Sequence, residues 1–244
     1  MDTVKIDSKN VKMIAHRGLS GLERENTCAA FVAAGNRSYY GIETDVHVTA
    51  DGKFVVIHDE TTERVSNGLF NVNVEESGYE DIKAVVLPDV DGSTHRTDIR
   101  IPLLADYIKI CSKYSKKCIL ELKNEFKTED IDELINEIQL TGYLENVVFI
   151  SFSMKNCLNL RNRLKENEIQ FLTSEEVTDE LIKTLTDNKL ELDIFYKRLT
   201  KEIADSLHDK GIKINVWTCD LPEDAINMVD MGVDYITTNI LEKE

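Results

Sequence analysis

The sequence predicts a closed (β/α)8 barrel of the TIM type. Its length of 244 residues suits this class, because such barrels commonly run to about 250 residues. Strand and helix patterns alternate almost from end to end. The strand segments are short, rich in β-branched residues and nearly unbroken in apolar character, which is typical of parallel strands covered on both faces. A doubly wound open sheet is the alternative, but its usual GxGxxG start is missing here.

The elements follow in order along the chain. Eight strands are expected at 11–16, 40–46, 118–123, 146–151, 169–174, 192–197, 213–218 and 234–238. Helices are expected between them. The first runs from Asn26 to Asn36 with Asn26 as its N-cap, and a later one has Thr128 as N-cap and Gly142 just past its end. Residues 60–101 are irregular, so we expect an insertion after the second strand within a single domain, 1–244.

Composition excludes several classes of protein. The net charge of −16, without a basic patch, argues against a nucleic-acid partner, and an anionic substrate would need a local cation. No apolar run approaches the roughly 18 residues of a membrane span, and the N-terminus lacks a signal-peptide core. The five cysteines are scattered without a CxxC pair, which argues against a disulfide framework or a zinc site. We therefore expect a soluble, cytoplasmic protein without stable membrane insertion.

The stretch IETDVHVTADGKFVVIHD (42–59) predicts a β-hairpin. Asp51 and Gly52 fit the two central positions of a type I′ turn, and that register places Asp45 opposite His58. The second arm is then an antiparallel return and not a barrel strand. If it were a barrel strand, there would be nine candidates for eight places.

The same hairpin gathers acids and imidazoles. Alternation along a strand puts Glu43, Asp45 and His47 on one face, with His58 returning towards them. Clustered acids repel one another unless a cation lies among them, so this convergence indicates a functional site. His47 by itself is interpreted as a rim residue.

Polar side chains recur where other predicted strands end. His16 and Arg17 follow the first strand, Glu121 and Lys123 end the third, and Trp217 ends the seventh. In (β/α)8 barrels the chemistry is located at the carboxyl ends of the strands. Taken singly, Lys123 could be an ordinary loop lysine and Trp217 a packing residue. Their occurrence at the same ends of strands as the acids and histidines indicates a site.

These residues fall into motifs that resemble the glycerophosphodiester phosphodiesterase family. The matches occur in order across residues 11 to 240, and the HR, ExD and HD set with its long spacer is the specific part. The matching segments are AHRG (15–18), ENT-x-x-AF (25–31), IETDV to HD (42–59), LELK (120–123), VWT (216–218) and GVDYITT (232–238).

The resemblance implies a barrel of the phospholipase C-like phosphodiesterase type that hydrolyses glycerophosphodiesters, such as glycerophosphocholine or glycerophosphoethanolamine, to glycerol 3-phosphate and an alcohol. It implies that Glu43, Asp45 and Glu121 bind a divalent metal, and that Arg17 and Lys123 contact the phosphate. An all-oxygen ligand set suits Mg²⁺ or Ca²⁺. The substrate partner is then a small molecule, and the oligomeric state stays open.

The family resemblance also implies that His16 and His58 form a general acid/base pair, with Trp217 as an apolar wall for glycerol or the head group. Our working assignment is His16 as base and His58 as acid. The sequence leaves open which histidine is which, and whether water attacks directly or a cyclic phosphate forms first. It departs from the family pattern at Arg24, where proline is usual, and at Asn239, where aspartate is usual.

Two alternatives remain. One is a phospholipase D-like lyase that releases a cyclic phosphate, although such proteins are secreted and disulfide-bearing. The other is a non-catalytic barrel that binds phosphate esters.

Overall fold

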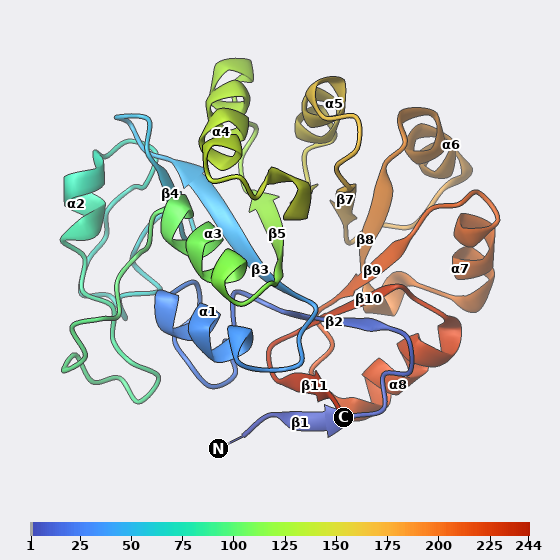
Figure 1. Cartoon of the computed structure of the whole chain (residues 1–244), viewed down its shortest axis with the longest axis horizontal. Coiled ribbons are helices and arrows are strands. Elements are labelled where there is room, and N and C mark those ends of the chain that lie inside the picture. Colours follow the sequence, from blue (N-terminus) through green and yellow to red (C-terminus); the bar gives the residue numbers. More distant parts are fainter. Residues whose placement is uncertain (1) are drawn as a thin grey trace.

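The computed structural model describes residues 2–244 and shows a closed parallel barrel (Figure 1). The neighbouring strands run β2-β10-β9-β8-β7-β6-β5-β3, and pairing of β2 with β3 closes the ring. This confirms the predicted fold, and each predicted strand agrees with the structure to within two residues at either end. The barrel strands are β2 (Lys12–Ala15), β3 (Gly41–Val48), β5 (Lys117–Leu122), β6 (Val147–Ser151), β7 (Ile169–Thr173), β8 (Glu191–Phe195), β9 (Ile214–Trp217) and β10 (Tyr235–Thr238).

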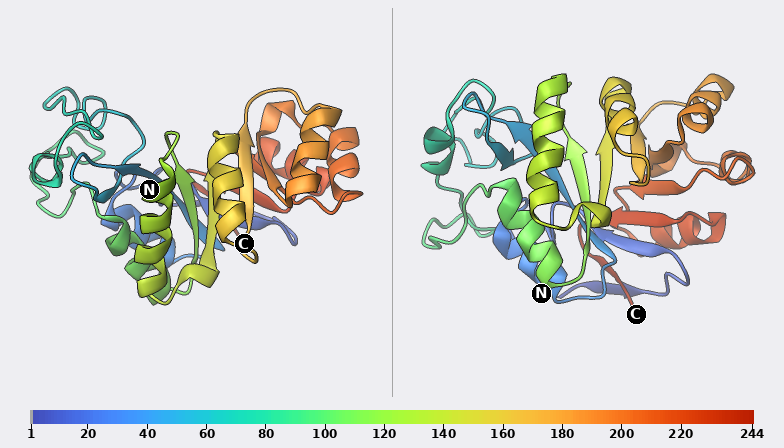
Figure 2. Two further views of the ribbon diagram at one scale, coloured as in Figure 1. Left: turned by 90° about the horizontal axis from the view of Figure 1, so that it is seen from above. Right: turned by 45° about the horizontal axis from the view of Figure 1, so that its top comes forward.

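Helices cover the outside of the barrel (Figure 2). They are α1 (Cys28–Gly35), α3 (Leu104–Lys113), α4 (Thr128–Leu140), α5 (Met154–Arg163), α6 (Asp179–Asn188), α7 (Lys201–His208) and α8 (Pro222–Met231), with short 3-10 turns η1 (Leu144–Asn146) and η2 (Tyr196–Arg198). The main apolar core lies between these helices and the strands. A smaller apolar cluster, which includes Ile14, Ile119 and Leu172, fills the lumen of the barrel.

The start of α1 differs from the prediction. Thr27, not Asn26, is the N-cap, because the Thr27 hydroxyl accepts the backbone N–H of Ala30 at 3.3 Å. Asn26 adopts a left-handed φ of 54° and turns inwards. Its side-chain amide donates to Asp45 at 2.8 Å and accepts the hydroxyl of Thr44 at 2.7 Å. The capping prediction was wrong because these long-range contacts take up the asparagine side chain.

The predicted cap of α4 is also shifted by one residue. Lys127 occupies the N-cap position, and Thr128 is the first residue of the helix. No side chain makes a capping hydrogen bond at this helix start. Gly142 lies just past the helix end with a φ of 71°, as expected for a glycine in the left-handed region.

The hairpin of β3 and β4 (Phe54–Val56) has a different turn and register from those predicted. β4 pairs antiparallel with β3 outside the ring, which confirms the return arm. However, His47 faces Val55 and Thr49 binds back to Lys53, so the loop holds three residues and only its last, Gly52, has a positive φ. This is the turn with a left-handed third residue that three-residue hairpin loops favour. The register therefore moves by one residue.

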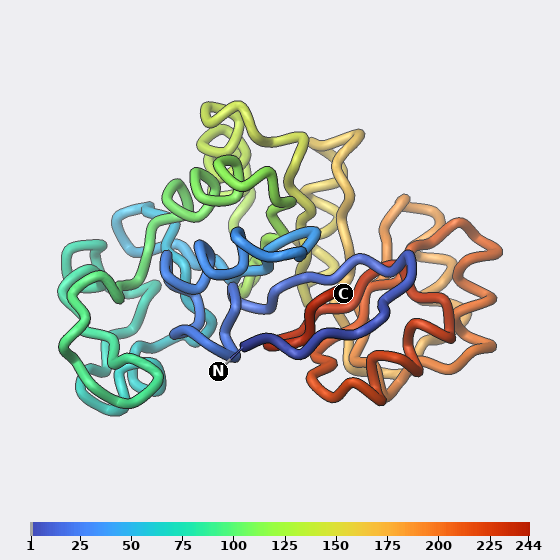
Figure 3. The backbone as a smooth tube through the Cα atoms, turned by 60° about the horizontal axis from the view of Figure 1, so that its bottom comes forward, coloured from blue at the N-terminus to red at the C-terminus, as the bar shows by residue number. Residues whose placement is uncertain are grey.

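The two chain termini pair with each other, which the sequence analysis did not anticipate. β1 (Val4–Ile6) and β11 (Leu241–Lys243) form a parallel two-stranded sheet. Figure 3 shows the blue N-terminal segment lying along the red C-terminal one. Glu242 anchors this sheet, because its buried carboxylate accepts the backbone N–H of Ser38 at 2.8 Å and pairs with Lys5 at 2.9 Å. The sheet lies between α1 and α8 (Figure 1).

The insertion at 60–101 lies to one side of the barrel and contains the short helix α2 (Tyr79–Lys83) (Figure 1). It has an apolar cluster of its own, in which Val65, Ile82 and Ile99 pack against Val55 and Ile57 from the return arm. The insertion is therefore anchored to the arm that carries His58.

Candidate active site

Three carboxylates meet inside the barrel, two from the middle of β3 and one from the end of β5. Asp45 and Glu121 are direct partners in the parallel register, and Glu43 precedes Asp45 by two residues on the same face. One oxygen from each acid lies within 4.8 Å of the others, and all three side chains are buried. The predicted acid cluster is therefore present as a group that could hold a metal ion.

Two basic residues contact this cluster. The Arg17 backbone N–H donates to Glu43 at 2.7 Å, and its guanidinium Nε lies 3.4 Å from Asp45. The Lys123 ammonium lies 2.8 Å from Glu121 and 3.4 Å from Asp45. Both predicted phosphate ligands thus stand beside the acids.

The two basic residues affect the pKa values of the three acids to different extents. Burial, reinforced by Asp45, raises the pKa of Glu121 to about 7, and burial with both neighbouring acids raises the pKa of Glu43 well above its usual range. Burial also opposes ionisation of Asp45, but Lys123 and Arg17 more than offset it and hold the pKa of Asp45 below its usual range. Arg17 and Lys123 therefore do not supply enough positive charge to keep Glu43 and Glu121 readily ionised, and a cation bound among the acids would do so.

His16 follows β2 and is fixed by a chain of polar contacts. Its Nδ1 lies 2.8 Å from the side-chain oxygen of Asn239, and its Nε2 lies 3.9 Å from Glu43. The amide of Asn239 donates to Asp220 at 2.6 Å, while the Ser20 hydroxyl donates to the same Asn239 oxygen at 2.6 Å. Burial and the nearby Arg17 lower the pKa of His16 to about 4.

His58 reaches the same cavity from the segment after β4. Ile57, and not His58, lies opposite Asp45, where its N–H donates to the Asp45 carbonyl at 3.1 Å. The predicted pairing of Asp45 with His58 is therefore wrong, because the loop holds an extra residue. The His58 Nδ1 lies 2.6 Å from Asp59. Burial, together with Arg17 and Lys123, lowers the pKa of His58.

His47 is not a rim residue. Its side chain is fully buried, with Nδ1 3.0 Å from Glu75 and Nε2 3.2 Å from the backbone carbonyl of His58. The prediction failed because the insertion, which carries Glu75, covers this part of β3. His47 thereby supports the backbone that presents His58.

A cavity of about 290 Å³ brings the predicted site residues together. Its lining includes both histidines, both basic residues and Trp217 from the predicted set, and Asp45 lies directly behind Arg17 and Lys123. The remaining wall has three apolar side chains, Ile150, Phe152 and Leu172, and three polar ones, Asp193, Thr218 and Thr237. Phe152 packs edge-on against Trp217 with ring centroids 5.7 Å apart.

The sequence analysis missed several supporting residues. Asn26 binds Asp45, and it follows Glu25 in the ENT motif. That motif could have indicated a role for Asn26 in the site. Arg64 binds both Glu25 and Asp59, and Asp220 holds Asn239, but neither Arg64 nor Asp220 carries a local signal. At Asn239 the chain lacks the usual aspartate, and Asp220 supplies a carboxylate next to it.

The fold and the site define a class: a (β/α)8 barrel with acids, histidines and basic residues around one cavity at the carboxyl ends of its strands. The sequence profile of the glycerophosphoryl diester phosphodiesterase family matches residues 16–243. The chain belongs to this family, which confirms the resemblance and the predicted enzyme class, a phosphoric diester hydrolase.

Individual relatives agree with this membership. A glycerophosphodiester phosphodiesterase of Caldanaerobacter subterraneus subsp. tengcongensis is 31% identical over 229 residues, 93% of each chain. The crystal structure of a glycerophosphodiester phosphodiesterase from Parabacteroides distasonis is 29% identical with a TM-score of 0.76, over 94% of this chain and 93% of the other. A phosphodiesterase of Oleispira antarctica, solved with the product sn-glycerol-3-phosphate, shares the fold: its TM-score is 0.82 at 20% identity, over 93% of this chain and 92% of the other.

Proposed function

We propose that the protein hydrolyses glycerophosphodiesters, such as glycerophosphocholine or glycerophosphoethanolamine, to glycerol 3-phosphate and an alcohol in a metal-dependent reaction with two catalytic histidines. One observation carries the proposal: His16 and His58 line the same 290 Å³ cavity as two of the three clustered acids. The product named for the Oleispira antarctica structure is consistent with this substrate class.

Glu43, Asp45 and Glu121 would hold the metal ion. Their donor atoms are all carboxylate oxygens, which favours a hard cation such as Mg²⁺ or Ca²⁺. The pKa values of Glu43 and Glu121 are raised, so a bound cation would stabilise their ionised forms. When bound, such an ion offsets the carboxylates and polarises the phosphoryl group. Arg17 and Lys123, which line the cavity, would bind the phosphate oxygens and stabilise charge that develops on them.

The hydrogen-bond partners of the two histidines support different roles. The Asn239 amide donates to Asp220, which points the Asn239 oxygen at His16 and makes Nδ1 of His16 a donor. Nε2 of His16 is then free to accept a proton, as a general base requires. His58 instead has the carboxylate of Asp59 on its Nδ1. That carboxylate favours the protonated ring and opposes the burial that lowers the pKa of His58, and this contact is what supports a general acid for the leaving alkoxide.

Activity of the two histidine variants tests the acid/base proposal. His16→Ala and His58→Ala should each lower kcat on glycerophosphocholine by roughly 10²–10⁴-fold, because each removes one proton transfer. Circular dichroism should show an unchanged fold. Full activity in either variant would refute its role. Phosphorus NMR of the reaction tests the route: a cyclic phosphate that appears before glycerol 3-phosphate would show attack by the glycerol hydroxyl, and a cyclic phosphate that accumulates as the end product is what the lyase alternative expects.

Metal binding is tested separately. Glu43→Gln should weaken binding of Mg²⁺ or Ca²⁺ in isothermal titration calorimetry, and EDTA should abolish wild-type turnover. Glu23→Gln is the matched control, since Glu23 pairs with Arg96 and does not line the cavity. Equal metal affinity in Glu43→Gln and wild type would show that Glu43 is not a ligand.

We also propose that the protein is cytoplasmic and that residues 1–244 form one domain. No helix within residues 2–244 combines the length and apolar character needed to cross a membrane. The five cysteines are all unpaired, which is consistent with a cytoplasmic location. We expect 1–244 to behave as one domain, since the insertion shares its apolar cluster with the return arm that pairs with β3, and a single unfolding transition would support this.

A further inference from the structure

Two side chains, Glu75 and His47, connect the insertion to the segment that carries His58. Oε1 of Glu75 lies 3.0 Å from Nδ1 of His47, and Nε2 of His47 lies 3.2 Å from the backbone carbonyl oxygen of His58. The imidazole of His47 is fully buried on β3. A chain of contacts therefore runs from the insertion through β3 to the return arm. The proposed reaction assigns no task to Glu75.

Both ring nitrogens of His47 face acceptors. A carboxylate and a backbone carbonyl accept hydrogen bonds but donate none, so the ring makes both contacts only when each of its nitrogens carries a proton. The carboxylate of Glu75 stabilises this doubly protonated ring, which is otherwise unfavourable in a buried position. A charged donor also makes the stronger hydrogen bond, and here that bond holds the carbonyl of His58.

Contacts on its backbone and its side chain hold Glu75 in one orientation. Its backbone N–H donates to the side-chain oxygen of Asn73 at 3.1 Å, and the preceding Val74 is fully buried in the apolar cluster of the insertion. The side-chain amide of Asn124, from the loop after β5, donates to the same Oε1 that contacts His47. Hydrogen bonds from His47 and Asn124 outweigh burial and lower the pKa of Glu75, so the carboxylate is ionised where it meets the ring.

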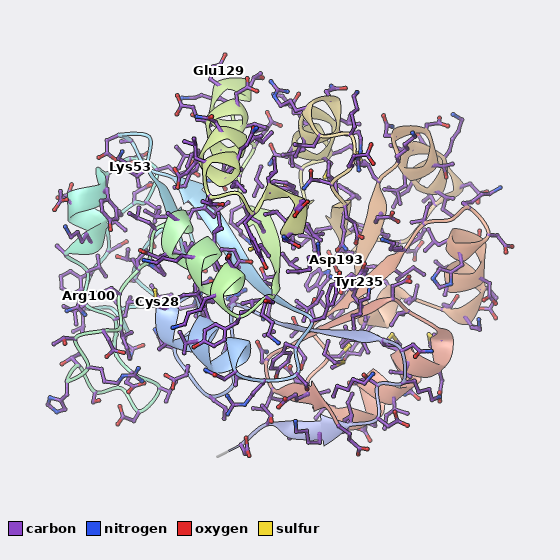
Figure 4. All side chains as sticks on the ribbon, viewed as in Figure 1. Cys28, Lys53, Arg100, Glu129, Asp193 and Tyr235 are labelled. Atoms are coloured by element: carbon purple, nitrogen blue, oxygen red, sulfur yellow. The ribbon has the colours of Figure 1, made fainter. Side chains whose placement is uncertain are left out.

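Glu75 does not line the catalytic cavity and instead lines a second one of about 230 Å³. The second cavity lies where the loop between β3 and β4 meets the start of α4. Figure 4 labels Lys53 and Glu129 on these two segments, and their sequence neighbours Gly52 and Asp130 line the cavity. An effect of Glu75 on the reaction must therefore pass through its contacts with other side chains.

We propose that Glu75 is a positioning residue that acts through His47 to fix the backbone at His58 and so directs the His58 ring into the catalytic cavity. This inference rests on the proposed function for the role of His58 as general acid. Without Glu75, a neutral His47 ring makes a weaker hydrogen bond to the His58 carbonyl, and the His58 ring is less often placed to protonate the leaving alkoxide. Substrate and metal binding should not change, because Glu75 contacts neither.

Two diesters with different leaving groups test this role. Choline leaves as an alkoxide that needs a proton, whereas p-nitrophenolate departs without one, so only the first reaction depends on a general acid. Glu75→Ala should lower kcat on glycerophosphocholine by about 3–30-fold, a part of the roughly 10²–10⁴-fold that a positioned proton transfer contributes. On the p-nitrophenyl diester of glycerol 3-phosphate, kcat should stay close to wild type, and KM should change little on either diester. Simple loss of folded enzyme would lower both rates equally.

Further variants guard the result. His58→Ala supplies the reference pattern, which Glu75→Ala should reproduce at smaller amplitude. Glu76→Ala is the matched control, because the adjacent Glu76 is also exposed but its carboxylate forms no ion pair within residues 2–244, and it should keep wild-type kinetics. Glu75→Gln keeps the size of the side chain and an acceptor oxygen, so it serves if Glu75→Ala does not fold, and it should show the same pattern with a smaller loss. Adding Glu75→Ala to His47→Ala should lower kcat no further, since the chain of contacts is already broken.

Hydrogen exchange follows the His58 backbone without any reaction and separates this inference from the proposed function. In Glu75→Ala the amides of residues 58–60 should exchange faster than in wild type and in Glu76→Ala, because the His58 carbonyl is held less firmly. Unchanged exchange there, a pattern on the two diesters that differs from that of His58→Ala, or additive losses with His47→Ala would overturn the role of Glu75. Wild type that cleaves neither diester refutes the proposed function, and the exchange result then decides by itself whether Glu75 fixes the His58 segment.

Discussion

Arg64 links the insertion to both sides of the proposed catalytic machinery. Its guanidinium donates twice to Glu25, at 2.9 and 2.8 Å, and twice to Asp59, at 2.6 and 3.1 Å. Asp59 in turn holds His58 at 2.6 Å, and Glu25 holds Arg17 at 2.9 Å. Arg64 is therefore a positioning residue, and we predict that Arg64→Gln impairs catalysis although Arg64 does not line the cavity.

The expected magnitude follows from these contacts. Hydrogen bonds to charged groups contribute about 1.5–3 kcal/mol, but the Arg64 side chain is 49% exposed, so solvent screening reduces the effect on His58 to about 1–2 kcal/mol. That corresponds to a loss of about 5–30-fold in kcat/KM. Removing a positive charge next to Asp59 should also raise the pKa of His58. If His58 is the acid, the basic limb of the pH profile moves to higher pH.

The assay is kcat/KM on glycerophosphocholine across a pH series. Arg96→Gln is the matched control, because Arg96 lies in the same insertion and pairs with Glu23, Asp89 and Asp98, and within residues 2–244 it forms no ion pair with a residue that lines the cavity. Arg64→Lys should recover only part of the rate, since an ammonium cannot bind two carboxylates in the bidentate manner. An Arg64→Gln enzyme with wild-type kcat/KM and an unshifted basic limb would refute the positioning role.

Two predictions concern stability. Gly18→Ala should lower the free energy of unfolding in urea by about 2–4 kcal/mol, because Gly18 has a φ of 77° and an added Cβ would lie 2.6 Å from the Cβ of Ala30; wild-type stability would contradict this. Glu242→Gln should destabilise the protein by about 1–2 kcal/mol at pH 7, because contacts with Ser38, Thr3 and Lys5 outweigh burial and lower the pKa of Glu242 to about 2. Because the folded pKa of Glu242 lies below the unfolded value near 4.5, its ionised carboxylate stabilises the fold above about pH 4.5. The difference in unfolding free energy between wild type and variant should therefore shrink as pH falls from about 4.5 towards 2. A difference that does not change with pH would exclude the carboxylate as its cause.

The barrel could be predicted from sequence because its signals are local. Apolar β-branched runs that alternate with capped amphipathic segments leave few topologies, and the barrel then brings the carboxyl ends of its strands to one mouth. His16, Glu121 and Trp217 stand at or just past such ends, and Glu43 lies two residues before Asp45 on the same face of β3, so their convergence followed from position along the strands. The approximate place of His58 followed from the hairpin, although its register was wrong by one residue.

The turn shows where local reasoning fails. Asp51 and Gly52 favour a two-residue turn by composition, but the Thr49 side chain donates to Asp51 and accepts the Lys53 backbone N–H, which stabilises a loop of three residues. Loops of both lengths contain the same dipeptide, so composition could not separate them.

The order of the strands, the family, and the kinds of side chain that meet at the mouth of the barrel could be inferred from the amino-acid sequence. The contacts that hold those side chains in place became apparent only in three dimensions: Asn26 on Asp45, Asn239 on His16, and Arg64 between two acids. Asn239 and His16 lie 223 residues apart, and such a pair carries no periodic signal in the chain. Its geometry comes from closure of the barrel, which makes the last strand a neighbour of the first.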